Sequence, residues 1–351
     1  MKPALAAILL LACALFAAPD PASAQPAEKP LFTDSSMLRL TLRGNFRELI
    51  RNAPRSEDAT PGSLALAGAA PETHVITLAP RGISRRRREV CTFPPIRVTF
   101  SQPPAATSLF RGQRRMRLVT HCRAAESFSN FTLLEYAAYR LFNVLTPQSI
   151  RVRLVMVDYV EQGEERPFAS RYGFLIEDGD DAARRNGLTE IEGPARIRVA
   201  QLSPREAGRA AVLQYMLGNL DWAMNAGPEG SACCHNSRLF GPAGATGNFI
   251  AVPYDFDYSG FVNAPYAVVP EQVPVSNVRV RRYRGFCVHN EAAQAAAAEF
   301  RAARPALLAA LAEVPGLEAR PRASAATYLE AFFRDVATPE AVSENLLRTC
   351  L

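Results

Sequence analysis

The chain has 351 residues, of which 48% are hydrophobic and 21% charged, the composition of an ordinary globular protein. The net charge is +6, and Lys2 and Lys29 are the only lysines, so arginine supplies nearly all of the positive charge. No basic motif with interleaved aromatic residues is present, which argues against nucleic-acid binding. The length allows one large domain or two, with a substantial core.

The N-terminus has the pattern of a secretory signal peptide. A basic start at Lys2 precedes an apolar run over residues 5–18, and Ala22-Ser23-Ala24 fits a small-residue cleavage site. A retained membrane anchor is the alternative, but the run is short for a membrane span. We therefore predict a signal peptide over 1–24, a flexible tail over 25–36 and a periplasmic or secreted protein without a membrane span after signal removal.

Cysteine usage agrees with export. Cys13 leaves with the signal peptide, and an even number of cysteines in an oxidising compartment predicts disulfides. Six cysteines allow fifteen pairings, and a bond between Cys91 and Cys122 is favoured because both flank neighbouring predicted strands. His121 beside Cys122 leaves a cysteine nucleophile open. Cys233-Cys234-His235 leaves metal ligation open, although the spacer typical of zinc sites is missing. The six remaining cysteines are Cys91, Cys122, Cys233, Cys234, Cys287 and Cys350.

The first half of the chain is predicted to be rich in strands. Residues 52–71 are rich in Pro, Gly, Ala and Ser and are predicted to form a loop. Apolar residues at helical spacing over 131–143 predict one helix, with Glu135 off the centre of its apolar face. The predicted strands begin near residue 37 and also cover residues 74–78, 96–100, 116–120, 152–160 and 172–178.

The second half is predicted to be mainly helical. Ser203-Pro204-Arg205-Glu206 has a capping serine, a proline in the first turn and a glutamate three residues on, which predicts a helix start. Gly218-Asn219 predicts the end of that helix. Asp221 is then expected in a loop directly after a buried helix, which is a rigid support for a functional group.

A short strand over residues 249–252 is expected to deliver Asp255 and Asp257. Residues 290–351 are predicted to form three helices, the last of which starts at Thr338-Pro339.

Acidic residues and an asparagine follow one another in an order that phosphoryl transfer requires. Asp221 is placed to accept a proton from a hydroxyl, and Asn236, Asp255 and Asp257 are placed to hold magnesium against phosphates. Asn225, four residues after Asp221, is a rival for the metal position. The alternative interpretation is a set of helix caps and turns.

These motifs carry a resemblance to a known group. The chain resembles the spore-coat CotH kinase-like family and, more distantly, HipA-type kinases, and it is most similar to a group of exported bacterial proteins of unassigned function. The resemblance covers roughly residues 37–290. The segments that carry it are Phe-Pro-Pro-Ile-Arg at 93–97, Leu-Val-Thr-His-Cys at 118–122, Gly-Asn-Leu-Asp at 218–221 and Val-Pro-Tyr-Asp-Phe-Asp-Tyr-Ser-Gly at 252–260.

The resemblance implies an α+β fold, a two-lobed kinase-like architecture with a strand-rich N-lobe over 37–180 and a helical C-lobe over 181–351. It also implies a nucleotide site. Arg81-Gly82-Ile83-Ser84 resembles a turn that closes over the phosphates, where the glycine at position 82 lets backbone amides approach an anion. Glu177-Asp178 resembles the hinge at which adenine and ribose dock.

Glu135 resembles the helix glutamate that pairs with a phosphate-binding base. No lysine follows Lys29, so Arg117 is the expected substitute for that base and Arg97 the alternative. An arginine grips phosphate through a planar fork and is no isostere of lysine.

Asp221 resembles the catalytic aspartate, and Asn236, preceded by His235 as a positioning residue, resembles the metal-binding asparagine. Asp255 resembles the metal-binding aspartate, with Asp257 sharing that role. The implied cofactors are Mg²⁺ and ATP, and the implied partners are a nucleotide and a protein or glycan acceptor.

The leading hypothesis is therefore an exported kinase-like protein that transfers a phosphoryl group from a nucleotide to a protein or glycan hydroxyl. A non-catalytic, pseudokinase-like module for periplasmic binding or envelope assembly is the alternative, favoured by the missing lysine and by export. A metal-dependent hydrolase built on Asp255, Asp257 and His235 is the third hypothesis.

Two arginine-rich segments remain outside these hypotheses. The run over residues 85–88 and the arginines within 279–284 could each bind an anion, or each could form a solvated surface.

Overall fold

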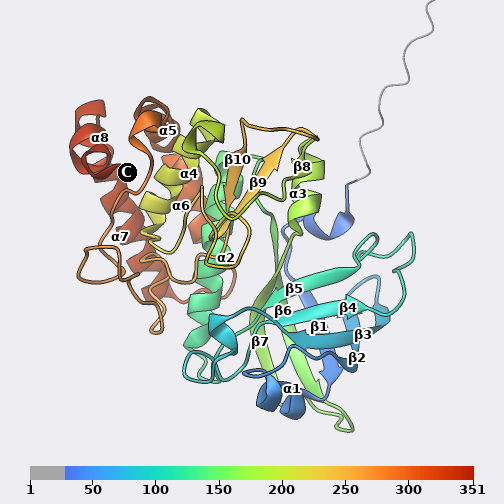
Figure 1. Cartoon of the computed structure of the whole chain (residues 1–351). Coiled ribbons are helices and arrows are strands. Elements are labelled where there is room, and N and C mark those ends of the chain that lie inside the picture. The colour runs from blue at the N-terminus through green and yellow to red at the C-terminus, as the bar shows by residue number, and fades with distance from the viewer. Residues whose placement is uncertain (1–27) are drawn as a thin grey trace, which may run out of the picture.

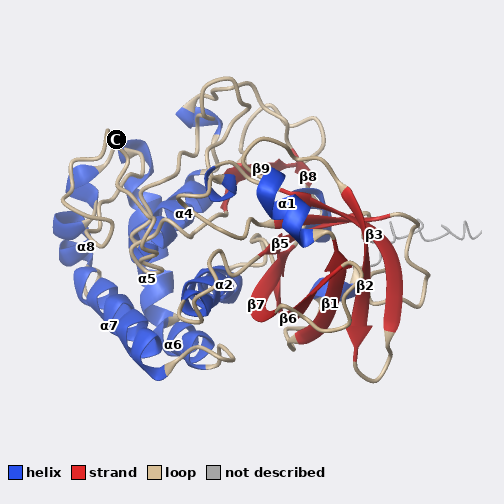
Figure 2. Cartoon of the chain, turned by 90° about the horizontal axis from the view of Figure 1, so that it is seen from below, coloured by secondary structure: helices blue, strands red, loops and turns tan. Residues whose placement is uncertain are grey.

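The computed structural model describes residues 28–351 (Figures 1 and 2). The predicted signal peptide, 1–24, and the first residues of the predicted tail lie outside the described residues. Within that tail, Pro30–Phe32 forms a short 3₁₀ helix (η1) whose Leu31 and Phe32 are buried.

Seven strands of the first half close into a barrel in the order β1-β2-β3-β4-β5-β7-β6. Neighbouring strands are antiparallel, except that β1 pairs with β6 in parallel and thereby closes the barrel. The strands are β1 (Leu38–Gly44), β2 (Thr60–Ala67), β3 (Glu72–Pro80), β4 (Ile96–Phe100), β5 (Arg115–Val119), β6 (Val152–Glu161) and β7 (Ala169–Ile176).

Alternation along the strands fills the barrel. In β4, Ile96 and Val98 are buried in the interior, whereas Arg97 between them is only partly buried and faces outward. Since successive side chains of a strand point to opposite faces, an apolar interior leaves polar residues on the outside of the barrel. The outward arginines of β4 and β5 are thus available to a site outside the barrel.

The helical part lies beside the barrel and has its own core (Figures 1 and 2). The long helix α2 packs against β6 and β7 of the barrel and against α6, and α4 packs against α5 and β10. A three-stranded sheet of order β10-β9-β8 accompanies α4. These elements are α1 (Phe46–Asn52), α2 (Phe128–Leu145), α3 (Gly179–Arg185), β8 (Thr189–Glu190), α4 (Pro204–Leu217), β9 (Ser237–Gly241), β10 (Ile250–Pro253), α5 (Asn290–Ala302), α6 (Arg304–Ala312), α7 (Ala319–Asp335) and α8 (Pro339–Asn345).

The predicted two-lobed kinase-like fold is wrong. The strands between residues 38 and 176 close into a seven-stranded mixed barrel, which is not the strand-rich lobe that the resemblance implied. The reason is the parallel pairing of β1 with β6, which brings together strands far apart in sequence. Periodicity identifies strands, but it carries no information on which distant strands pair.

The loop predicted over residues 52–71 is also wrong, because Thr60–Ala67 forms β2. Its composition is poor for a strand, yet Leu64 and Leu66 point into the barrel and β2 pairs with both β1 and β3. At Gly62 a Cβ would lie 2.6 Å from the carbonyl oxygen of Arg43, so the lack of a side chain permits this close approach. Tertiary pairing overrides the local preference here.

Most other expected elements are confirmed. The helix predicted over 131–143 extends over Phe128–Leu145, and α4 begins at Pro204 and ends at Gly218, which adopts φ +60°. The last helix begins at Pro339 with Thr338 as its cap. Residues 290–351 form four helices, one more than predicted.

The predicted bond between Cys91 and Cys122 is confirmed, and two further disulfides join Cys233 to Cys234 and Cys287 to Cys350. Bonding of the Cys233 and Cys234 sulfurs to each other removes them as zinc ligands. The other two bonds span sequence separations of 31 and 63 residues. Each contributes on the order of 4 kcal/mol by restricting the unfolded chain.

None of the helices in the described part of the chain is long and apolar enough to cross a membrane.

A buried histidine in the barrel is expected to make the free energy of unfolding fall in acid. His121 is 3% exposed and stacks on Phe93, with ring centroids 4.5 Å apart, and burial lowers the pKa of His121 to about 4. The unfolded chain takes up this proton near pH 6.5, so the stability contributed by neutral His121 is present above pH 6.5 and is lost towards pH 4.

We expect His121→Gln to lose less stability than the wild type when the pH falls from 7 to 4.5, by up to about 3 kcal/mol. Urea unfolding at both pH values measures this difference. Equal losses in the two proteins would contradict the assignment.

Candidate functional site

The hairpin of β9 and β10 brings two of the predicted metal ligands together. Ser237 at the start of β9 pairs with Pro253 at the end of β10. Just beyond this pair, the backbone N–H of Tyr254 donates to the carbonyl oxygen of Asn236 at 3.0 Å. Asn236 and Asp255, which follow directly on the two sides, therefore lie at the same end of the hairpin.

Asp221 joins Asn236 through two contacts. The side-chain amide of Asn236 donates to the backbone oxygen of Asp221 at 2.6 Å and to its Oδ2 at 3.1 Å. The other carboxylate oxygen lies 2.7 Å from Nε2 of His235. This hydrogen bond, opposed by partial burial, raises the pKa of His235, and the negative charges of Asp221 and Asp255 act in the same direction.

The loop geometry explains why Asp221 reaches this point. Gly218 ends α4 in the left-handed conformation, where a Cβ would lie 2.0 Å from the hydroxyl oxygen of Tyr328. The side chain of Asn219 then accepts a hydrogen bond from the N–H of Asp221 at 3.1 Å. A glycine is required at this turn both for the conformation and for space.

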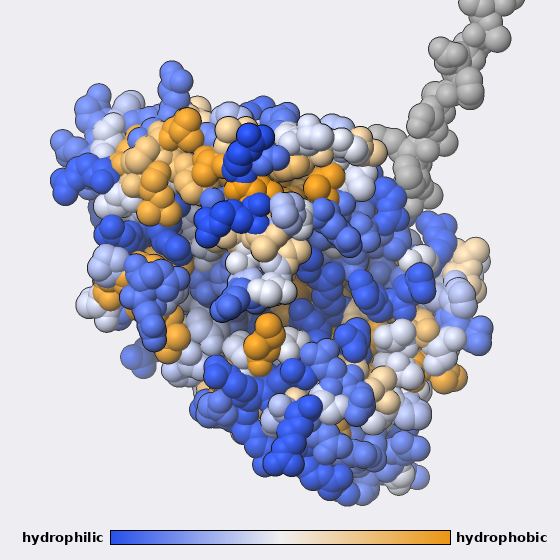
Figure 3. Space-filling view, in the orientation of Figure 1, coloured by the Kyte–Doolittle hydropathy of each residue, from blue (hydrophilic) through white to orange (hydrophobic). Residues whose placement is uncertain are grey.

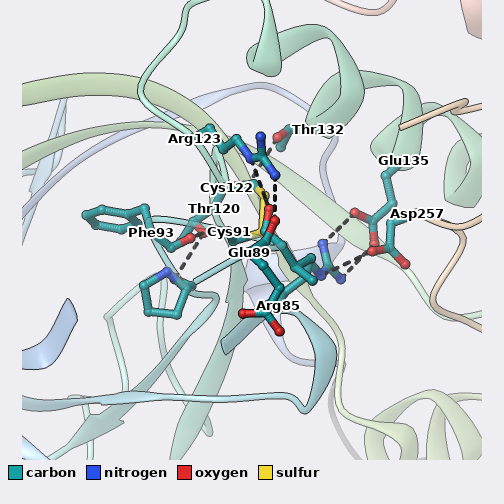
Figure 4. The surroundings of a disulfide bond; sticks show 12 residues. Arg85, Glu89, Cys91, Phe93, Thr120, Cys122, Arg123, Thr132, Glu135 and Asp257 are labelled. Atoms are coloured by element: carbon teal, nitrogen blue, oxygen red, sulfur yellow. Dashed lines mark hydrogen bonds and ion pairs between the residues drawn. A yellow bond between two sulfur atoms is a disulfide. The ribbon is translucent and has the colours of Figure 1, made fainter. Parts of the chain in front are cut away.

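A buried guanidinium forms the second half of the site. Arg85, which is 8% exposed, donates to Oε2 of Glu135 at 2.9 Å, and its Nε lies 3.3 Å from Oδ2 of Asp257 (Figure 4). It also donates to Oδ1 of Asp255 at 3.0 Å. We call this cluster the Arg85 cage. Its members come from η2 (Ser84–Arg86), from α2 and from the segment after β10, so it connects the barrel side to the helical side.

The cage holds one positive charge among three carboxyl groups. Burial opposes the charge of the Arg85 guanidinium. The carboxylates of Asp257, Glu135 and Asp255 nevertheless raise the pKa of Arg85 well above its usual value. Burial raises the pKa of Glu135 and, more strongly, that of Asp257. Apart from its ion pair with Arg85, Oδ2 of Asp257 has no hydrogen-bond partner among the described residues. The cage is thus acidic in excess, and only Asp255, with a side chain 40% exposed, reaches solvent.

Asp255 is held in an unusual backbone conformation. Its φ is +63°, a region in which few residues with a side chain occur. The N–H of Asp255 donates to the hydroxyl of Tyr139 at 2.8 Å, while Arg85 holds Oδ1. Among residues 28–351, no hydrogen bond or ion pair engages Oδ2 of Asp255.

The disulfide of Cys91 and Cys122 anchors the segment that carries Arg85 (Figure 4). Beside this bond, the guanidinium of Arg123 donates to the backbone oxygens of Val90 at 3.0 Å and Glu89 at 2.7 Å. The segment over 84–93 is thereby fixed to the end of β5.

Two of the predicted phosphate-binding arginines also approach the site. Burial and the nearby guanidinium of Arg117 lower the pKa of Arg81 to about 10, while Asp255 acts in the opposite direction. In residues 28–351, Arg81 has no carboxylate partner within 4.0 Å. Arg117 donates to Oδ2 of Asp178 at 2.9 Å. Arg81 therefore remains a charged group available to an anion.

The turn after Arg81 has the openness expected of a ligand contact. Gly82 adopts φ +85° with open space where a Cβ would be, and the neighbouring Ile83 is 86% exposed. Burial raises the pKa of the Tyr258 hydroxyl, and the side chain of Ser84 acts in the opposite direction.

Two residues make contacts that differ from those the resemblance implied: Glu135 was expected to pair with Arg117, and Glu177 was expected at the nucleotide hinge. Glu135 contacts Arg85 and not Arg117, which pairs with Asp178. Glu177 is 4% exposed, and both of its carboxylate oxygens accept hydrogen bonds from Arg185, at 3.0 and 2.9 Å. The carboxylate of Glu177 thus holds α3 in place, and Asp178 is the member of this dipeptide that lies near the arginines.

A polar cavity of about 950 Å³ lies outside β4 and β5, next to the start of α3. Five basic and three acidic side chains line it, so the cavity has an excess of positive charge. Its lining residues are Lys29, Arg97, Thr99, Phe100, Pro103, Gly112, Gln113, Arg114, Arg115, Asp178, Asp180, Asp181 and Arg184.

Figure 3 shows how hydrophilic and hydrophobic residues are distributed over one face of the molecule. Hydrophobic residues gather around the upper helical part, whereas the barrel side is mainly hydrophilic, and the face is hollowed between the two.

Sequence reasoning missed Arg85 and Tyr139. Arg85 was hidden in a run of four arginines that has the appearance of a solvated surface. Tyr139 lies four residues after Glu135, so both point from the same face of α2, and this spacing was the available signal.

No family model matches the chain, and no curated protein matches its sequence at a significant level.

The contact between Tyr139 and Asp255 predicts a coupled loss. Tyr139→Phe leaves the N–H of Asp255 without its partner, which we expect to cost about 1 to 3 kcal/mol in the free energy of unfolding. If Asp255 ligates the magnesium expected from the sequence, the change should also weaken binding of Mn²⁺, a probe for such a site, because Asp255 is no longer held in place. Chemical denaturation and metal titration measure the two effects.

Tyr136→Phe is the matched control. Tyr136 is buried one turn earlier on α2, and its hydroxyl makes no hydrogen bond within residues 28–351. Equal effects of the two substitutions would count against a specific role for Tyr139.

Proposed function

We propose that this site transfers a phosphoryl group from a nucleotide to a hydroxyl group, with Mg²⁺ as cofactor. The observation that carries the proposal is the convergence of Asp221, Asn236 and Asp255 at one end of the β9–β10 hairpin. Asp255 is also near enough to Arg81 to raise its pKa electrostatically. Phosphoryl transfer depends on positioning and on charge stabilisation, for which a carboxylate, a metal site and a phosphate-binding cation are the necessary parts. The proposal rests on these side chains and not on a kinase fold.

Asn236 and Asp255 are the proposed metal ligands. The amide nitrogen of Asn236 is engaged by Asp221, which leaves Oδ1 for a metal, and Arg85 occupies only one oxygen of Asp255. Mg²⁺ keeps several water molecules and takes few protein ligands beside phosphate oxygens, so two protein oxygens fit it. When bound, the metal would neutralise charge on the phosphates. Asp257, 4% exposed and against Arg85, supports the site from behind.

Arg81 and Arg117 are the proposed phosphate-binding groups. Both carry guanidinium groups close enough to influence each other electrostatically, and an arginine fork binds phosphate oxygens bidentately. Asp178, the partner of Arg117, lines the cavity of about 950 Å³, which has the size of a site for a nucleotide-sized ligand. Arg81, Arg117 and Asp255 do not line this cavity themselves.

Asp221 is the proposed proton acceptor. The acceptor oxygen attacks the terminal phosphorus, the bond from that phosphorus to the bridging oxygen breaks, and the hydroxyl proton passes to the Asp221 carboxylate. Asn236 and His235 orient that carboxylate through contacts of 3.1 and 2.7 Å. A protein or glycan hydroxyl is the proposed acceptor class.

A non-catalytic binding module is the second candidate, and one observation favours it. Arg85 already neutralises part of the acid cluster, so the site does not depend on a metal for charge balance. Binding of nucleotide and metal without transfer would support it.

The hydrolase hypothesis has less support. Its acids Asp255 and Asp257 both contact Arg85, and its His235 is bound to Asp221.

We also propose that the protein acts in the periplasm or outside the cell. Disulfides persist in oxidising compartments, and the bonds Cys91–Cys122 and Cys287–Cys350 hold the site segment and the C-terminus.

Metal and nucleotide titration tests the proposal. We expect Mn²⁺ to bind and to strengthen ATP binding. We expect Asp255→Asn and Asn236→Ala to weaken Mn²⁺ binding at least tenfold, because the first removes the negative charge of a ligand and the second removes a ligand. Asp58→Asn, the same charge change at an exposed position after α1, should leave binding unchanged.

Asp221→Asn should retain Mn²⁺ and ATP binding but lose at least about a hundredfold in transfer rate. Mn²⁺ affinity that is equal in Asp255→Asn and Asp58→Asn would exclude this metal site.

A further inference from the structure

The bond between Cys233 and Cys234 differs from the other two disulfides, because it joins adjacent residues. The bonds that span 31 and 63 residues restrict the unfolded chain. A bond between neighbours closes no loop of chain, so it removes almost no entropy from the unfolded state. This bond is therefore expected to affect the local conformation of the chain and not the free energy of unfolding of the whole protein.

Its location is next to the proposed site. Cys234 directly precedes His235, the partner of Asp221. The N–H of Cys233 donates to the backbone oxygen of Pro194 at 3.0 Å, and the N–H of His235 donates to that of Ala226 at 2.9 Å. The disulfide thus lies between two backbone anchors that fix the path of the chain into β9.

The two sulfurs differ in accessibility. Cys234 is 9% exposed, with Sγ 3.0 Å from the backbone oxygen of Met224, whereas Cys233 is half-buried. Bonded sulfurs lie about 2 Å apart, but non-bonded sulfurs need at least about 3.5 Å. Opening the bond therefore forces a displacement, and since Cys234 is packed, this displacement falls on Cys233. Opening also breaks the small covalent ring that includes the peptide bond between the two cysteines, so the backbone that leads to His235 gains conformational freedom.

We propose that Cys233–Cys234 is a redox modification site, at which a dithiol reductant opens the bond and loosens the segment that carries His235 and Asn236. The oxidised form holds this segment in the conformation that binds Asp221. The reduced form has a more mobile segment, and, on the basis of the proposed function, weaker metal binding.

The bond opens by thiol–disulfide exchange. A thiolate of the reductant attacks Sγ of Cys233, the disulfide bond breaks, and Cys234 leaves as a thiolate that takes up a proton. The second thiolate of the reductant attacks the mixed disulfide and releases Cys233, which is also protonated. Two electrons and two protons pass from the dithiol to the cysteine pair, and the reductant becomes a disulfide.

Hydrogen exchange tests the proposal independently of any metal. The wild-type chain and a Cys287→Ser/Cys350→Ser variant are treated with graded dithiothreitol, and alkylation with peptide mass spectrometry identifies which pairs are open. The variant removes the other accessible pair, since Cys287 is exposed. Amide exchange is then followed over residues 233–238 and, as a control, over β6.

We expect Cys233–Cys234 to open while Cys91–Cys122, buried at 2% and 5% exposure, stays bonded. Exchange over 233–238 should rise at least fivefold with β6 unchanged, and Cys233→Ser/Cys234→Ser should exchange rapidly without reductant. Equal exchange in both redox states, or earlier opening of Cys91–Cys122, would overturn the proposal.

Mn²⁺ titration of the same samples tests the coupling. We expect at least tenfold weaker Mn²⁺ binding after reduction and in the double serine variant. If the oxidised protein binds no Mn²⁺, the proposed function fails, whereas the exchange result still decides the redox site. If Mn²⁺ binding is unchanged by reduction, the link between the disulfide and the metal site is refuted.

Discussion

The Arg85 cage is the constraint on which the site depends. One guanidinium contacts Glu135 of α2, Asp255 and Asp257, so a single side chain joins the barrel segment to the helical part. Such a cluster is costly to break, because removal of the cation leaves several buried carboxyl groups without compensation. The cation also contacts all three acids whose carboxylate oxygens lie close enough together to hold a metal, which is why the proposed metal is assigned to Oδ2 of Asp255.

The surrounding structure keeps this cluster in place. The parallel pairing of β1 with β6 closes the barrel, and the Cys91–Cys122 bond ties the segment that bears Arg85 to the end of β5. On the other side, Tyr139 and the β9–β10 hairpin orient Asp255. The site is therefore assembled from rigid elements on both sides, as preorganised binding of charged groups requires.

The sequence predicted local features well and distant pairing poorly. The end of α4 at Gly218 and the strand before Asp255 follow from glycine conformation and apolar alternation, which act over a few residues. The barrel does not follow from such local signals, because its closure and the strand character of Thr60–Ala67 depend on partners elsewhere in the chain. In the site, the order of acids pointed to Asp221 and Asp255, but Arg85 could not be recognised in its run of arginines without knowledge of what lies opposite.

The most direct test of this account is the position of a bound metal. Anomalous diffraction from crystals that contain Mn²⁺ and a non-hydrolysable ATP analogue should show one metal ion at about 2.1 Å from Oδ1 of Asn236 and Oδ2 of Asp255. Arg85 should remain between Glu135 and Asp257. A metal ion in the place of the guanidinium, or one that contacts neither Asn236 nor Asp255, would contradict the account.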